Sequence, residues 1–384
     1  MTSSRACRGL QSHPKSPCAG PIPVTSKVHS DLSISIIVPA FNRQRLIGET
    51  LESLLRQSQP AREVIVVDDG STDDTCKEIG RFVPRVTLLR QPQAGPGAAR
   101  NAGLARASGD FIQFFDSDDL ASRNLLQAKA HAIEGTQADI AYGPWLPVWL
   151  EASMCRHDGF VRQAAAVPLS PLSAFLRGWV LIIPNCLIRR RSVQRCGGYP
   201  THLRTSEDML LLFRLLRGGA RLAYTPHSLM LVRQHPAGQI SADPAGLAQR
   251  AIEQVNFTGT VLSELAATAG ESMQSRPAAS LRDILAWRVR HAQATSAAQT
   301  SGHTCGAEQI LPGTSRRDLM MSRTLAAFHR IERALRSRLI GHHIPSAYCA
   351  RPLDAAQAEL IHDLGYTPQR SSPTPATHQR NPLQ

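Results

Sequence analysis

The stretch that decides the fold is residues 35–75, SIIVPAFNRQRLIGETLESLLRQSQPAREVIVVDDGSTDDT. Its first β-branched run ends at Pro39 and predicts a buried strand, and the apolar residues that follow recur at helical spacing. EVIVV at 63–67 predicts a second buried strand, and DDGSTDDT predicts a turn and a helix start. Strands alternating with helices are typical of α/β proteins with a mostly parallel sheet.

The alternation continues beyond this stretch. Further strands are predicted at RVTLL (85–89), DFIQFF (110–115) and DIAY (139–142), with an Ala-rich helix ending near Ala107. Residues 143–180 show no regular pattern, and we expect them to be irregular. Regular signals return later, as NCLIRR (185–190), the amphipathic helix SEDMLLLFRLLRGG (206–219), RLAY (221–224) and LMLVRQH (229–235).

Composition narrows the class of protein. The 43 basic and 30 acidic residues give a net charge of +13, which favours nucleotides, nucleic acid or an acidic membrane surface as partners, although a basic surface can also serve solubility alone. No apolar run approaches the roughly 20 residues that span a bilayer. The eight cysteines form no CxxC pair, which fits reduced cytosolic thiols better than disulfides or a zinc site.

The chain divides into four predicted parts: a disordered tail (1–32), an α/β domain (33–244), a mainly helical extension (245–369) and a second disordered tail (370–384). Within the extension, SRTLAAFHRIERALRSRLI (322–340) places leucines and arginines on different sides of a helix. Such a helix can lie on a membrane surface or pack on the neighbouring domain.

Polar side chains follow three of the predicted strands. Asn42 follows the first strand, Asp68 and Asp69 end the second, and the acids of DSDD (116–119) follow a later one. Ligands of such sheets bind beyond the carboxyl ends of the strands. Solvated turns explain any one of these groups, but all three together favour a binding site on that rim.

DSDD places three acids within four positions, where like charges repel. It is not the start of an EF-hand loop, because the sixth and twelfth positions are Ala121 and Gln127 instead of Gly and Glu. Two carboxylates on a tight turn can still hold Mg²⁺ or Mn²⁺, which keeps positions open for substrate phosphates. A divalent cation thus accounts for the cluster better than a solvated turn.

Two further motifs have alternative interpretations. AGPGAARNAG fails as a dinucleotide fingerprint, because Arg100 stands where a third small residue belongs, so Arg100 either faces an anionic ligand or lies on a flexible loop. Glu207 and Asp208 open a helix after Ser206, a possible N-cap. These acids either stabilise the helix N-terminus or supply a general base.

Four blocks, in order, resemble glycosyltransferase family 2, the inverting enzymes of the GT-A nucleotide-diphospho-sugar transferase fold. They are the opening stretch, GPGAARNAGLARASGDFIQFFDSDDL, PNCLIRRRSVQRCGGYPTHLRTSEDMLLLFRLLRGG and LVRQHPAGQIS. Together they cover about residues 33–241. The resemblance implies a mostly parallel central sheet flanked by helices. The predicted helical C-terminal extension carries no motif that resembles the family.

The resemblance also implies a role for each motif residue. Asp116 and Asp118 fill the DxD motif, with Asp118 as direct ligand of Mg²⁺ or Mn²⁺, and Asp208 is the catalytic base beside Glu207. The residues implied in nucleotide-sugar binding are Pro39, Phe41, Asn42, Asp68, Asp69, Arg100, Asp116, Arg233 and His235.

The function expected from this resemblance is metal-dependent, inverting transfer of a sugar from a nucleotide diphosphate, with a UDP-sugar as the expected donor. The acceptor would be a hydroxyl of a glycan or lipid-linked molecule, as in cell-envelope polysaccharide synthesis, and no nucleic-acid role is expected. The expected location is the cytoplasm, with peripheral contact at the inner face of the membrane as an option. The alternatives are a nucleotidyltransferase and a non-catalytic binder of nucleotide-sugars or membrane surfaces.

Overall fold

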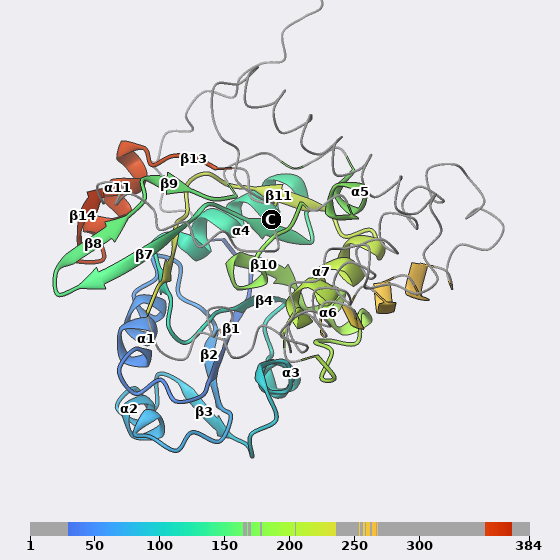
Figure 1. Cartoon of the computed structure of the whole chain (residues 1–384), viewed down its shortest axis with the longest axis horizontal. Coiled ribbons are helices and arrows are strands. Elements are labelled where there is room, and N and C mark those ends of the chain that lie inside the picture. Colours follow the sequence, from blue (N-terminus) through green and yellow to red (C-terminus); the bar gives the residue numbers. More distant parts are fainter. Residues whose placement is uncertain are drawn as a thin grey trace, which may run out of the picture.

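The computed structural model describes residues 30–163, 167, 170–176, 179–203, 205–235 and 350–370, with parts of 253–267. Its larger sheet has seven strands in the order β11-β6-β10-β4-β1-β2-β3 (Figure 1). The strands are β1 (Ile34–Ala40), β2 (Glu63–Asp68), β3 (Thr87–Arg90), β4 (Phe111–Phe114), β6 (Ile140–Tyr142), β10 (Cys186–Arg189) and β11 (Leu222–Tyr224). β10 runs antiparallel to both neighbours and the other pairs are parallel. The predicted α/β class with a mostly parallel sheet is confirmed.

Helices cover both faces of this sheet, because alternate strand residues are apolar on either side. In β1, Ile36 and Val38 belong to one buried cluster and Ile37 to the other. The first face carries α1 (Ile47–Leu55), α2 (Thr75–Gly80) and α4 (Leu125–Thr136). The second carries α3 (Pro96–Arg106), α5 (Pro171–Leu176), α6 (Arg190–Arg195) and α7 (Glu207–Arg217). The larger sheet and its helices thus form three layers around two apolar clusters.

Helix α3 lies unusually close to β1. A Cβ added to Gly103 would stand 2.4 Å from Cγ2 of Ile37, so only glycine fits there. The helix begins after Gly95, whose φ of 94° is a left-handed value that favours glycine, and Pro96 occupies its first turn. The glycine-rich motif therefore has a structural use at both ends of α3.

A second sheet has five strands in the order β14-β8-β7-β12-β5. They are β5 (Leu120–Ala121), β7 (Trp145–Glu151), β8 (Met154–His157), β12 (Met230–Arg233) and β14 (Thr367–Arg370). The expectation that 143–180 is irregular was wrong, because β7, β8, β9 (Phe160–Val161) and α5 fall within it. Pro147 interrupts the apolar pattern of β7, and the turn to β8 places Ala152 at a φ of 49° without the usual glycine or asparagine.

Residues 350–370 complete this second sheet. β13 (Arg351–Pro352) pairs with β9, and β14 pairs in parallel with β8. Between them α11 (Ala355–His362) starts with a capping box of Asp354 and Gln357 and buries Ile361 against the sheet. The predicted domain boundaries remain predictions. The expected amphipathic helix at 322–340 and both predicted tails, apart from residues 30–32 and 370, lie outside the described residues.

Within the described ranges, none of the helices combines the length and apolar character needed to cross a bilayer.

A buried polar cluster joins the two sheets. Lys129 of α4 is fully buried, and its Nζ donates to Oε1 of Gln113 at 3.2 Å and to Oδ1 of Asn185 at 3.0 Å. Asn185, in the 3-10 turn η1 (Ile183–Asn185), donates in turn to the carbonyl of Gly143 at 2.7 Å, just before β7. Burial lowers the pKa of Lys129 to about 7. The cluster therefore holds β4, η1 and the start of β7 together around one ionisable group.

Candidate active site

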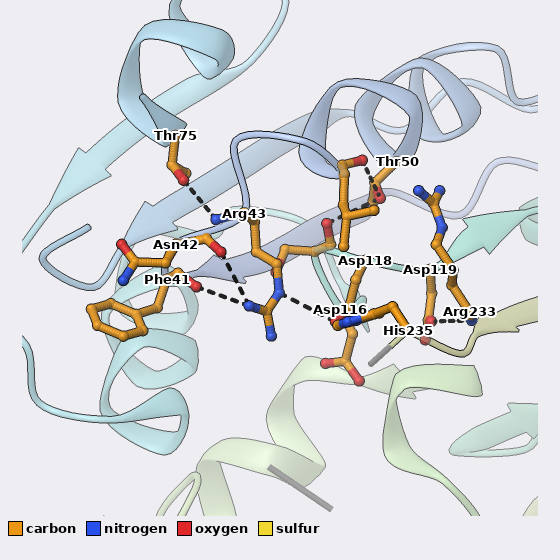
Figure 2. Close-up of polar contacts among 12 residues, drawn as sticks. Phe41, Asn42, Arg43, Thr50, Thr75, Asp116, Asp118, Asp119, Arg233 and His235 are labelled. Atoms are coloured by element: carbon orange, nitrogen blue, oxygen red, sulfur yellow. Dashed lines mark hydrogen bonds and ion pairs between the residues drawn. The ribbon is translucent and has the colours of Figure 1, made fainter. Parts of the chain in front are cut away.

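The loop after β1 is held against the loop after β2. Asn42 adopts a left-handed backbone conformation with a φ of 52°. Its N–H donates to Oγ of Ser71 at 3.0 Å, and its Oδ1 accepts from the N–H of Thr72 at 2.9 Å. Pro39 lies within β1, and Phe41 and Asn42 follow this strand at the carboxyl end of the sheet (Figure 2). These predicted nucleotide-binding residues therefore stand on a loop whose main chain is fixed.

Asp68 and Asp69 are both buried at the end of β2. The Asp69 carboxylate accepts from the main-chain N–H of Ala94 at 2.9 Å and of Gly95 at 2.8 Å. Asp68 Oδ1 accepts from the N–H of Ser71 at 3.3 Å. Both acids thus shape the loops around the strand ends, and Asp69 fixes the segment that starts α3. Their predicted contact with a nucleotide remains a prediction.

The acids of DSDD separate into two kinds. Asp116 and Asp118 are half-buried, whereas Asp119 is buried and accepts from the main-chain N–H of Arg233 at 2.9 Å. Asp118 Oδ2 lies 3.2 Å from Nε of Arg43 and 3.1 Å from Nε2 of His235 (Figure 2). Asp116 Oδ1 accepts from Arg100 at 2.7 Å. Two carboxylates therefore face neighbouring cations, and the third anchors β12.

The same three acids differ in pKa. Burial acts to raise the pKa of Asp118, but the hydrogen bond from His235 and the charge of Arg43 outweigh it and hold the pKa below its usual value. Burial raises the pKa of Asp116 despite the opposing charge of Arg100. Burial and the charges of both neighbouring acids raise the pKa of Asp119 well above its usual value. Asp118 is therefore the best ionised of the three at neutral pH.

Arg100 connects the DSDD acids to helix α7. Its guanidinium is buried, with Nη2 donating to Asp116 at 2.7 Å and Nη1 donating to Oε1 of Glu207 at 2.8 Å. Its Cζ lies 5.0 Å from the centre of the Tyr199 ring. A single side chain thus joins two carboxylates that are far apart in sequence. Arg100 was predicted to lie near the nucleotide. The structure places it between Asp116, a predicted metal ligand, and Glu207, the neighbour of the predicted general base.

The acids of α7 are not arranged as an ordinary helix cap. Ser206 has a left-handed backbone, with a φ of 65°, and makes no capping hydrogen bond through its side chain. Asp208 Oδ1 accepts from the N–H of Met209 at 2.7 Å, and Glu207 pairs with Arg100. The possible Ser206 cap is therefore not found, which weakens the purely structural explanation of these acids.

Both α7 acids hold their protons more tightly than usual. Burial and the charge of Asp208 raise the pKa of Glu207 to about 7, against the opposing charge of Arg100. Burial, aided by the charge of Asp116, also raises the pKa of Asp208. A carboxyl with a raised pKa is a better proton acceptor once it is ionised. Asp208 is the more exposed of the two and makes no ion pair with Arg100 like that of Glu207, so its geometry suits a base better.

Arg233 and His235 close the site from β12. Arg233 is buried, and its Nη2 lies 3.0 Å from Oε2 of Glu49 in α1. Tyr366, before β14, donates to the same Glu49 oxygen at 3.2 Å. Arg233 and His235 thus lie beside the DSDD acids. The role in nucleotide-sugar binding that the resemblance implies for them remains a prediction, and Glu49 and Tyr366 were not predicted.

Three contributors were missed in the sequence. Arg43 lies in the loop after the first strand. The three acids of DSDD need a positive charge nearby, and this need is the signal that could have identified Arg43. Nothing in the local sequence distinguishes Glu49 from an ordinary polar residue of a helix. Tyr366 lies in a segment without any recognised motif, so no local signal marked it.

The donor set fits a divalent cation that shares its coordination with a ligand. Among the described residues, no group of three or more His, Cys, Asp or Glu side chains is arranged to hold a metal. Asp116 and Asp118 nevertheless present hard carboxylate oxygens on one turn, and Asp118 is ionised. Mg²⁺ is commonly held by one or two carboxylates plus substrate phosphates. The residues present fit that mode and not an all-protein cage.

Comparison with known proteins agrees with the motif analysis. Residues 35–161 match the family described as glycosyl transferase family 2. Glycosyltransferase GlyA of Streptococcus pneumoniae is 38% identical over 116 residues, which are 29% of this chain and 17% of GlyA. Poly(ribitol-phosphate) beta-N-acetylglucosaminyltransferase TarS of Staphylococcus aureus is 36% identical over 115 residues, which are 28% of this chain and 20% of TarS.

A solved structure of S. aureus TarS 1-349 in complex with UDP-GlcNAc is 19% identical, with a TM-score of 0.49, covering 71% of this chain and 93% of that one. The sequence matches span only about a fifth of the curated relatives, 17% of GlyA and 20% of TarS. The family match at residues 35–161 includes the β1 and β2 loops and DSDD, so the family resemblance seen in the motifs is confirmed. The similarity to glycosyl transferase family 2 is thus shown for residues 35–161 of this chain.

Proposed function

We propose that this protein is a glycosyltransferase that moves a sugar from a nucleotide diphosphate, with a UDP-sugar as the expected donor, to an acceptor hydroxyl. The family match supports the reaction class, and the relatives GlyA and TarS carry glycosyltransferase names. The TarS structure was obtained with UDP-GlcNAc, which supports a nucleotide-sugar donor by analogy. The observation that carries the proposal is the Arg100 bridge between Asp116 and Glu207.

That bridge brings together two groups with opposite tasks. As a nucleotide-sugar reacts, its diphosphate leaves the anomeric carbon and gains negative charge, which nearby cations stabilise. The acceptor hydroxyl loses a proton to a base on the other side of the sugar. The DSDD turn, with Arg43 and His235 around Asp118, suits the diphosphate end. Asp208 on α7 suits the base, and one displacement of this kind inverts the anomeric carbon.

Asp118 and Asp116 would hold Mg²⁺ or Mn²⁺ between them and the donor phosphates. When bound, the cation would supply charge stabilisation for the departing diphosphate. Arg100 keeps Asp116 oriented, and Arg233 holds the turn through Asp119. Transfer to a glycan or lipid-linked acceptor, cytoplasmic location and contact with the inner face of the membrane are part of the same proposal, and they rest on the sequence alone.

The test is nucleotide release from a panel of UDP-, GDP- and dTDP-sugars with Mn²⁺, comparing wild type with Asp118→Asn. A matched control is Asp363→Asn, an exposed acid on the turn after α11. Release of nucleoside diphosphate from one donor, lost only in Asp118→Asn, would support the proposal and name the sugar. Release of pyrophosphate from a nucleoside triphosphate would favour a nucleotidyltransferase instead. Absence of both release and metal-dependent binding of any donor would refute it.

A further inference from the structure

Arg43 combines a fixed main chain with a side chain that reaches Asp118 in the proposed donor site. Its main chain is fixed on both sides, since its N–H donates to Oγ1 of Thr75 at 2.7 Å and its carbonyl accepts from the N–H of Leu46 at 2.9 Å and of Ile47 at 3.0 Å, where α1 begins. Only the side chain is left to respond to a ligand. That side chain is 17% exposed and reaches across the rim to DSDD (Figure 2).

The Arg43 guanidinium contacts the Asp118 carboxylate and two main-chain carbonyls of its own loop. Its Nε lies 3.2 Å from Oδ2 of Asp118, and its Nη1 donates to the carbonyls of Phe41 and Asn42, both at 3.2 Å. Those carbonyls belong to the two residues immediately before Arg43. Losing the Asp118 contact would therefore leave the local contacts in place and would free one face of the carboxylate oxygen.

Arg43 shares this oxygen with His235, whose Nε2 lies 3.1 Å away. The His235 contact is a hydrogen bond, whereas the Arg43 contact is an ion pair between the guanidinium and the carboxylate. A divalent cation that binds Oδ2 would therefore meet the positive charge of Arg43 at the same oxygen and would compete with it. Arg100 does not offer the same freedom at Asp116, because it is buried and also pairs with Glu207.

Charge balance points the same way. Asp118 pairs with Arg43 and Asp116 pairs with Arg100, while the Arg233 side chain pairs with Glu49. A divalent cation entering alone would add a surplus of positive charge next to Arg43. A diphosphate entering with the cation would remove that surplus and offer Arg43 new oxygens, to which guanidinium groups bind strongly.

We propose that Arg43 is an exchangeable counter-cation, which pairs with Asp118 in the ligand-free protein and moves to the donor diphosphate when the divalent cation takes its place. This deepens the proposed function and rests on it. The substitution Arg43→Gln should therefore have two effects of opposite sign. Mn²⁺ alone should bind more tightly, because a competing positive charge has gone. The nucleoside diphosphate should bind more weakly in the presence of Mn²⁺, because a phosphate partner has gone.

The experiment measures Mn²⁺ affinity by electron paramagnetic resonance, and the affinities for UDP, GDP and dTDP in saturating Mn²⁺ by calorimetry. We expect Arg43→Gln to tighten Mn²⁺ binding about threefold to tenfold and to weaken binding of the preferred nucleotide about tenfold, the scale of one partly exposed ion pair. The exposed neighbour Arg45 supplies the control, and Arg45→Gln should change neither affinity. Arg43→Met, which keeps most of the aliphatic stem, replaces the glutamine variant if that variant is unfolded by thermal melting.

Each outcome separates the two hypotheses. If the wild type binds none of UDP, GDP and dTDP with Mn²⁺, the proposed function fails, whatever the variants do. If the wild type binds one of them and the folded variant lacks either of the two changes, the exchange is refuted and the proposed function stands. Equal changes in Arg45→Gln would also refute it, since they would show a general effect of surface charge.

Discussion

Arg100 illustrates how a buried charge becomes useful through its partners. A guanidinium with little solvent access is costly unless anions neutralise it. Here Asp116 and Glu207 do so at 2.7 and 2.8 Å, and the ring of Tyr199 covers one face. Because both partners belong to the proposed catalytic groups, the arginine that stabilises the core also sets the distance between the turn after β4 and helix α7.

The raised pKa values on α7 give donor turnover a definite pH dependence. A base works only when ionised, and the pKa of Asp208 is raised while that of Glu207 is about 7. Turnover should therefore rise with pH and level off at a higher pH than an aspartate with an ordinary pKa would give, measured as nucleotide release at saturating donor. Asp208→Asn should lower it by roughly 10²–10⁴-fold while leaving UDP binding unchanged. A pH-independent rate, or an active Asp208→Asn protein, would remove Asp208 from the role of base.

Lys129 should make the free energy of unfolding depend on pH above about 7. Its pKa is lowered to about 7 in the fold from an unfolded value of 10.5, so the unfolded state binds more protons between these values. The free energy of unfolding should therefore rise with pH from about 7 to 10.5, by up to about 1.4 kcal/mol per pH unit from this residue. Urea unfolding of wild type and Lys129→Met at several pH values tests this. The variant should lose the slope, and equal slopes would contradict the assignment.

Among the elements, the packing of α3 on β1 is the most demanding. A Cβ at Gly103 would meet Ile37 Cγ2 at 2.4 Å, whereas Gly135 near the end of α4 has nothing within 4 Å. Gly103→Ala should lower the free energy of unfolding by about 1–3 kcal/mol through overpacking. Gly135→Ala, the matched control, should raise it by up to about 1 kcal/mol through helix propensity. Denaturant unfolding measures both, and the same sign for both variants would show that close approach does not decide the effect.

The larger sheet could be predicted from the sequence because its strands are continuous apolar runs. β1 and β2 are buried on both faces, so their residue types alone mark them. The second sheet could not be predicted in the same way. β7 contains Pro147, the turn at Ala152 carries no glycine, and β14 pairs with β8 from a distant part of the chain.

The residues of the candidate site also divide into those that the sequence could predict and those that it could not. Asp116, Asp118 and Asp208 were found because their motifs are local and ordered along the chain. Arg43 and Glu49 were missed because their meaning depends on which side chain they face across the rim, and this depends on tertiary packing. The roles of the predicted residues in binding and catalysis remain predictions, and their juxtaposition is what the structure adds.

At the scale of the whole molecule, residues 350–370 reach the proposed active site. Tyr366 donates to Glu49, Glu49 pairs with Arg233, and Arg233 donates to Asp119. Burial raises the pKa of Tyr366 to about 12, so its hydroxyl stays protonated and able to donate. Tyr366→Phe should raise the KM for the donor about twofold to fivefold with kcat less affected, since it loosens a residue that positions the DSDD turn.

The control for this prediction is Tyr224→Phe, which removes a hydroxyl from a tyrosine whose ring packs on Tyr142 in the larger sheet. That variant should leave both kinetic constants unchanged. Steady-state nucleotide release at varied donor concentration measures them. If Tyr366→Phe behaves like Tyr224→Phe, residues 350–370 have no influence on the donor site.

The pairing of β14 with β8 also has a consequence for how the protein is made. Every strand of the larger sheet has left the ribosome once Tyr224 has emerged, whereas Thr367, the partner of Met154, is translated much later. Throughout that interval the outer edge of β8 lacks its neighbour and offers unpaired main-chain groups to other nascent chains. Slow translation between these points would lengthen the exposure. Yield in cells should therefore depend on codon usage between β12 and β14 more than on codon usage before β8.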